Sequence, residues 1–133
     1  MSVSRIRQRD LTMKMVYQYS FYPNPELDTQ IGNFLELQDN LEEEDRALLL
    51  SRAQDIFIKI PSIDEQIGSY SKDWDISRMN KADLSILRLA VYEILYDPGV
   101  ETSLAINEAV NLAKQYGGED SPRFVNGILA RFA

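Results

Sequence analysis

The stretch ADLSILRLAVYEIL, residues 82–95, decides the fold class, because its apolar residues cover nearly every side of a helix. A helix of this kind must be packed against several neighbours rather than lie on a surface. Asn80 followed by Asp83 resembles a capping box at its start, and Asp97-Pro98-Gly99 breaks it at its end. The sequence therefore predicts a central, buried helix over about 82–95.

Helical signals continue on both sides of this central segment. After it, Thr102 or Ser103 caps a helix that Gly117-Gly118 closes, and Ser121 as N-cap with Pro122 begins the last helix. Before it, apolar spacing and the breaks at residues 23–25 and at Pro61 predict four more helices. These are expected from Ser4 to about Ser20, from Glu26 to Leu37, from the cap at 39–40 to Pro61, and from the capping box at Ser62 to about Trp74.

The fold class follows from these elements. Alternating strand patterns and hairpin turns are missing from the sequence. About seven helices with short connections predict an all-α fold in which two small helical bundles pack together. We expect one domain over residues 1–133, with an N-terminal subdomain of about 1–72, a C-terminal subdomain of about 80–133 and a subdivision near 72–80.

Composition removes most enzyme classes. The 133 residues include no Cys and no His, which excludes thiolate nucleophiles and the commonest general base and metal ligand. No glycine-rich phosphate loop is present. We therefore expect no enzymatic activity, no catalytic residue, no metal and no cofactor. The sequence also has no apolar run of the ~18 residues needed to span a membrane and no secretory signal, so a cytoplasmic protein is expected.

Charge is distributed unevenly along the chain. The net charge is −7, which argues against indiscriminate coating of nucleic acid. Residues 1–14, however, carry Arg5, Arg7, Arg9 and Lys14 against Asp10 alone, a balance of +3, and the other 119 residues carry −10. Guanidinium groups bind phosphates and stack on unpaired bases, so this basic segment is a candidate for single-stranded RNA. A solvated helix start is the alternative interpretation.

Two further segments carry candidate binding residues. In the loop at 116–124, helix capping accounts for the glycines, Ser121 and Pro122, which leaves Asp120, Arg123 and Phe124 unexplained. An aromatic ring such as Phe124 near arginines can serve as a platform for a base. At the end of the first helix, Tyr17, Tyr19, Phe21 and Tyr22 form a cluster that fits either the core or an interface.

Residues 105–129, AINEAVNLAKQYGGEDSPRFVNGIL, resemble the C-terminal signature of the NusB family of bacterial transcription antitermination factors. The central helix at 82–94 is similar to the same family. The spaced arginines leading into Met15-Val16-Tyr17 are similar to it as well. The resemblance covers nearly the whole chain in the same order.

The resemblance implies an all-α fold of two packed helical subdomains and a function in transcription. Family members pair with NusE, a small-subunit ribosomal protein, and the pair binds the single-stranded boxA element of nascent ribosomal RNA. The complex, with NusA and NusG, promotes readthrough of terminators by RNA polymerase. By position, Arg5, Arg7 and Arg9 match the family's RNA-binding arginines; Asp120, Arg123 and Phe124 match its RNA-side loop; Tyr17 and Asp83 match its NusE-facing side.

The chain also departs from the family pattern. Ile6 and Gln8 interrupt the arginine run, Thr12-Met13-Lys14 follow where smaller residues are common, and no basic tail follows Ala133. These departures predict weak RNA binding by the chain alone and dependence on NusE. Two alternatives remain: a homodimeric helical interaction module, or an RNA-binding domain related to that of ribosomal RNA cytosine methyltransferases. The free protein could also form a homodimer.

Overall fold

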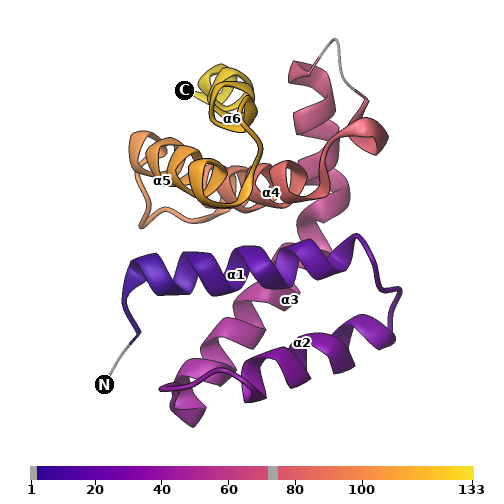
Figure 1. Ribbon diagram of the computed structural model, residues 1–133, viewed down its shortest axis with the longest axis vertical. Coiled ribbons are helices and arrows are strands. Elements are labelled where there is room, and N and C mark those ends of the chain that lie inside the picture. The colour runs from indigo at the N-terminus through magenta and orange to yellow at the C-terminus, as the bar shows by residue number, and fades with distance from the viewer. Residues whose placement is uncertain (1–2, 72–74) are drawn as a thin grey trace. The chain divides into compact units, whose positions relative to one another are not determined.

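The computed structural model describes residues 3–71 and 75–133, and every regular element in these residues is helical (Figure 1). The predicted all-α fold is therefore confirmed. Trp74 and the start of the predicted subdivision at 72–80 lie outside the described residues. The elements are α1 (Arg5–Tyr19), α2 (Glu26–Glu36), α3 (Glu43–Tyr70), the 3₁₀ helix η1 (Ile76–Arg78), α4 (Lys81–Tyr96), α5 (Thr102–Tyr116), α6 (Ser121–Leu129) and the 3₁₀ helix η2 (Ala130–Phe132).

The chain forms two compact units, residues 1–58 and residues 59–133, and the division between them falls inside α3. The N-terminal unit contains α1, α2 and the first part of α3. The C-terminal unit contains the rest of α3, α4 to α6 and both 3₁₀ helices (Figure 1). Each unit has its own buried apolar side chains.

The core of the N-terminal unit is built from apolar residues spaced at helical intervals. Leu11 and Met15 lie one turn apart on α1, and both are at most 2% exposed. They belong to a buried cluster to which all three helices of the unit contribute. Its other members are Leu27, Ile31, Leu35, Leu41, Leu49 and Ala53.

Helix α3 continues through Pro61, so the predicted stop at Pro61 and new helix at Ser62 are wrong. Proline inside a helix costs about 3 kcal/mol, because it removes a hydrogen bond and clashes with the preceding turn. The surrounding sequence outweighs this cost, since four isoleucines at helical spacing are at most 1% exposed. They are Ile56, Ile60, Ile63 and Ile67. Burying each isoleucine contributes roughly 1.5–3 kcal/mol.

Helix α4 is the centre of the C-terminal unit, as predicted. All eleven residues from Asp83 to Glu93 are buried, and both α5 and α6 pack against the helix. Asn80 is its N-cap: the side-chain oxygen accepts hydrogen bonds from the backbone N–H groups of Ala82, at 2.8 Å, and Asp83, at 3.3 Å. The predicted capping residue is therefore confirmed.

A buried ion pair joins α4 to the last part of α3. Arg88 is 6% exposed. Its Nε and Nη2 atoms donate to the two carboxylate oxygens of Asp64, at 2.9 and 2.8 Å. This two-bond geometry is the arrangement in which a guanidinium and a carboxylate match best. It compensates a charge that burial of α4 takes out of water.

The loop between α5 and α6 depends on a close approach at Gly117. A Cβ atom at this position would lie 2.4 Å from Cβ of Ser121 and 2.8 Å from the carbonyl oxygen of Ala113. Ser121 is the first residue of α6 rather than its cap, which is Asp120. The Ser121 hydroxyl instead accepts a hydrogen bond from the Gly118 N–H, at 2.9 Å. The prediction of Ser121 as N-cap is thus corrected, because its hydroxyl closes the loop.

Gly117→Ala is expected to distort this loop and to lower the free energy of unfolding by roughly 1–3 kcal/mol, the usual range for overpacking. Gly118→Ala is the matched control, because its new Cβ would meet only the Ser121 hydroxyl oxygen, at 4.0 Å. Urea unfolding of both variants measures the difference. Equal stability of the two variants would contradict the close-approach argument.

Asp64→Ala is expected to destabilise the protein by roughly 2–3 kcal/mol, because it leaves the buried Arg88 without its carboxylate. The expected value lies at the lower end because the Asp64 side chain is 24% exposed. Lys14→Ala is the control. It breaks the partly exposed Lys14–Asp10 pair on α1, 3.0 Å apart, and should change stability by about 0.5 kcal/mol or less. Thermal and urea unfolding compare the two.

Candidate functional site

The first turn of α1 carries the basic residues nearest the N-terminus. Ser4 caps the helix, with its hydroxyl oxygen accepting the Arg7 backbone N–H at 3.2 Å. Arg5 is exposed in this turn, and Ile6 beside it is 72% exposed. The turn therefore presents one arginine and one large apolar side chain to solvent.

The other basic side chains of α1 lie in different environments. Arg7 is half-buried, and its guanidinium donates to the backbone carbonyls of Asp39 and Asn40. Arg9 is 8% exposed. Lys14 is half-buried and pairs with Asp10. Arg5 is thus the exposed member of the four predicted RNA-binding residues of the N-terminal unit.

The aromatic cluster at the end of α1 divides between the core and the surface. The Tyr19 ring stacks on Phe57, with centroids 5.6 Å apart, and is partly buried against the core. Tyr17 is 39% exposed and contacts Phe21, with ring centroids 5.0 Å apart. Phe21 and Tyr22 are 52% and 37% exposed. Tyr17, the predicted partner-binding residue of this unit, therefore belongs to an exposed aromatic patch of Tyr17, Phe21 and Tyr22.

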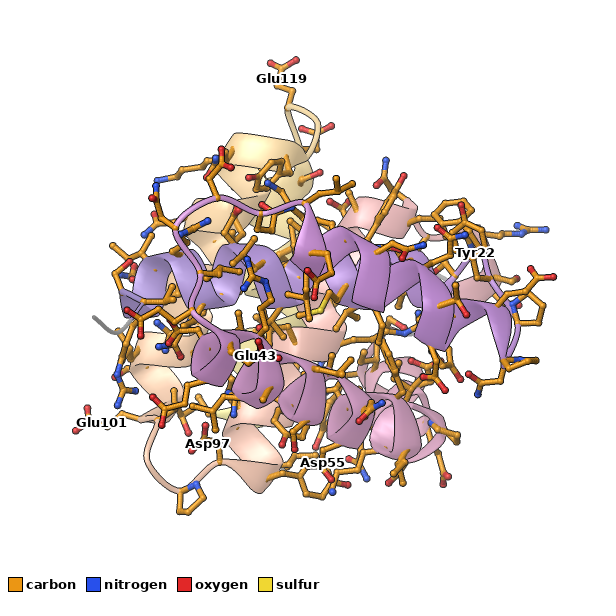
Figure 2. The ribbon with its side chains drawn as sticks, turned by 90° about the horizontal axis from the view of Figure 1, so that it is seen from below. Tyr22, Glu43, Asp55, Asp97, Glu101 and Glu119 are labelled. Atoms are coloured by element: carbon orange, nitrogen blue, oxygen red, sulfur yellow. The ribbon has the colours of Figure 1, made fainter. Side chains whose placement is uncertain are left out.

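The C-terminal unit contains a hollow of about 440 Å³ at the start of α4. It brings together Asp83, Asp120 and Phe124, which the sequence assigns to two different surfaces. Arg123 is exposed on α6 and is not among the lining residues, and Glu119 projects from the tip of the α5–α6 loop (Figure 2). The lining residues are Arg78, Met79, Asn80, Asp83, Gly118, Glu119, Asp120, Ser121 and Phe124.

Asp83 is the most unusual residue of this hollow. It is 7% exposed, yet its Oδ1 atom has no hydrogen-bond partner within the described chain. A buried acceptor without a partner costs about 1–3 kcal/mol, and more when it is charged. The Oδ1 atom of Asp83 is therefore a buried acceptor without a partner in the described chain, in a residue that lines the hollow.

Several lining residues were not predicted from the sequence. Arg78 reaches the hollow from η1, and Met79 and Asn80 lie between η1 and α4. Asp75 caps η1, with the Ser77 backbone N–H 3.0 Å from its carboxylate. That bond, the Ser77 hydroxyl and the nearby Arg78 together lower the pKa of Asp75. The Asp75 cap is a local signal, but the position of Arg78 beside residues 118–124 depends on the tertiary fold.

The hollow combines carboxylates, a guanidinium, an amide and an aromatic ring, so it can receive a hydrogen-bond donor or cation and pack a planar group against Phe124. No cluster of three or more potential metal-ligating His, Cys, Asp or Glu side chains occurs among the described residues. None of the helices in the described chain is long and apolar enough to cross a membrane.

Comparisons with known proteins agree with this fold. The model of the NusB family matches residues 6–133. The "Transcription antitermination protein NusB" of Acetivibrio thermocellus is 42% identical over 97% of this chain and 88% of its own length. That of Agathobacter rectalis is 37% identical over 98% of this chain and 100% of its own. The solved structure of T. maritima NusB superposes with a TM-score of 0.88 at 31% identity, covering 100% of this chain and 92% of that one. The chain belongs to the NusB family.

Proposed function

We propose that this protein is a transcription antitermination factor that pairs with NusE and binds the single-stranded boxA element of nascent ribosomal RNA. The pair acts with NusA and NusG on RNA polymerase in the cytoplasm and promotes readthrough. Membership of the NusB family supports this proposal, as does the name that the curated relatives carry. The role is one of binding, without catalysis or a cofactor.

The observation that carries the proposal is the hollow at the start of α4. Asp83, proposed to face NusE, and Asp120 and Phe124, proposed to lie beside RNA, line the same hollow. A protein docked against Asp83 would therefore touch the loop that meets RNA. This arrangement couples the two binding events through contiguous contacts, which is what a partner-dependent RNA-binding protein requires.

The charges of the chain suit a basic partner. Asp83 and Asp120 line the hollow with carboxylates, the groups with which a lysine or arginine of a ribosomal protein pairs best. The net charge of −7 attracts such a partner over a longer range. The exposed patch of Tyr17, Phe21 and Tyr22 adds apolar rings of the kind found at protein interfaces.

RNA contacts are proposed on both units. In the N-terminal unit the proposed RNA-binding segment is the part of α1 that carries Arg5, Arg7, Arg9 and Lys14, with Arg5 offering the exposed guanidinium. In the C-terminal unit, Arg123 supplies an exposed charge, Asp120 accepts hydrogen bonds from bases, and Phe124 offers a ring for stacking. Because the chain presents so few exposed cations there, its own RNA affinity is expected to be low.

The first test compares the chain alone with the chain bound to NusE in titrations of a boxA RNA at physiological salt. The pair should bind much more tightly, because the partner adds positive charge and further contacts to the RNA. Equal affinity of the chain alone and the pair would contradict the proposal, and so would an RNA affinity that does not depend on the boxA sequence.

Arg5→Ala in the NusE pair should lower boxA affinity and flatten the dependence of log K on log salt by roughly 0.7, the value for one lost phosphate contact with a single strand. The matched control is Lys114→Ala, which removes an exposed cation from the last turn of α5. It should leave the slope unchanged. An unaltered slope for Arg5→Ala would remove Arg5 from the RNA site.

Phe124→Ala should weaken boxA binding by the pair by about 1–3 kcal/mol, the usual loss when a stacked base loses its aromatic platform. Phe124 is half-buried, so Phe124→Leu is measured beside it, because leucine keeps the apolar packing but has no ring face for a base. Both variants should lose affinity if a base stacks there. Full binding by Phe124→Leu would assign the residue to packing alone.

A further inference from the structure

The connection between α2 and α3, residues 37–42, is held by arginines from two different helices. From α1, Arg7 donates through Nη2 to the carbonyl of Asp39 and through Nη1 to that of Asn40, at 3.4 Å. From α3, Arg46 donates through Nε to the carbonyl of Leu35, at 3.2 Å, and through Nη2 to that of Gln38, at 3.4 Å. The last carbonyls of a helix have no partner within it, and these guanidinium groups supply donors to them and to the loop that follows.

This connection has a backbone shape that requires support. Asn40 has a φ of 60°, in the left-handed region that side chains other than glycine adopt only at some cost. The next residue, Leu41, is 6% exposed and belongs to the core of the N-terminal unit. The Glu42 N–H then donates to the Asp45 carboxylate, at 3.2 Å, beside the start of α3. The connection is therefore one defined conformation, and Arg7 is bound to the part with the unusual φ.

The hydrogen bonds of Arg7 to Asp39 and Asn40 also hold the first turn of α1 in place. Arg7 is the third residue of the helix, and the Ser4 hydroxyl accepts its backbone N–H. The Gln8 side chain donates to the carbonyl of Val3, at 2.8 Å. A helix end frays readily unless it is tied to the rest of the protein. The hydrogen bond from Arg7 to Asp39, 32 residues further along the chain, fastens the first turn of α1 in this way. Arg5 lies in the same turn.

We propose that Arg7 is a positioning residue for RNA binding. It fixes the first turn of α1 on the α2–α3 connection so that Arg5 faces the RNA, and it does not itself neutralise a phosphate. The inference rests on the proposed function and divides the arginine motif into a contacting residue, Arg5, and a supporting residue, Arg7. Its geometric basis is that the Arg7 guanidinium is half-buried and already bonded to two carbonyls, whereas Arg5 is exposed.

The experiment measures boxA binding by the NusE pair across a salt series for Arg7→Gln and Arg7→Lys, with Arg5→Ala beside them. Without the tie, the first turn must be ordered on binding, so Arg7→Gln should lose roughly five- to tenfold in affinity at every salt concentration, with an unchanged slope. Lysine keeps the charge but lacks the two-pronged geometry, so Arg7→Lys should behave like Arg7→Gln. A flattened slope for Arg7→Gln with wild-type binding by Arg7→Lys would overturn the proposal.

Hydrogen exchange of the free protein gives a readout that does not involve RNA. Arg7→Gln should speed amide exchange in residues 5–8 and 39–42, and Arg5→Ala should not. Arg46→Gln loosens the same connection without altering α1. It should speed exchange in residues 39–42 and, like Arg7→Gln, lower RNA affinity. Unchanged amide exchange in both segments of Arg7→Gln would show that the Arg7 hydrogen bonds do not hold the first turn of α1, and would overturn the proposal. If the unmodified pair bound no boxA RNA, the proposed function would fail, even if hydrogen exchange showed that Arg7 holds the first turn of α1.

Discussion

The burial of α4 on all sides is the constraint on which the C-terminal unit depends. A helix with no solvent-facing side must find a partner for each polar side chain it carries, because an unpaired buried charge is costly. Arg88 meets this requirement through two hydrogen bonds to Asp64. Asp83, about one and a half turns earlier, does not: its buried Oδ1 atom has no partner in the described chain, and the residue lies beside the hollow. The same burial that stabilises the fold thus creates the acceptor that the candidate site offers.

Local rules predicted those parts of the fold in which local structure and tertiary packing agree. Asn80 caps α4 as expected, because its side chain bonds to N–H groups within three residues. At Pro61 the local rule that proline ends a helix gives the wrong prediction, because tertiary packing outweighs it. The helix-breaking effect of the proline is smaller than the gain from burying the isoleucines at 56, 60, 63 and 67 along one stripe. That gain depends on what packs against the stripe, which a proline rule does not include.

The sequence named part of the residues that line the hollow, Asp83, Asp120 and Phe124, but not their arrangement. Arg5 and Arg9 are neighbours on a helical wheel, yet Arg5 is exposed and Arg9 is buried, with only 8% of its surface exposed. Their environments differ because Arg5 lies at the helix end and Arg9 one turn further in. The bonds of Arg7 reach residues 32 and 33 positions away, beyond any local pattern. Likewise, Asp83 and Phe124 are assigned to different surfaces by position in the chain, although one hollow contains both.

The charges of the chain give a physical reason why the RNA site proposed for it would be weak. Non-specific RNA binding is mainly a matter of phosphate neutralisation, and a chain with a net charge of −7 and few exposed cations on its proposed RNA face disfavours it. Under the proposed function, bound NusE and this chain contact the same RNA, so the second contact forms at a high effective concentration. Affinity then rises only for an RNA that satisfies both proteins. Under the proposed function, the low intrinsic affinity of this chain is therefore a source of specificity. The hydrogen bonds of Arg7 to the α2–α3 connection then keep Arg5, the one exposed arginine of α1, in a conformation that can bind RNA.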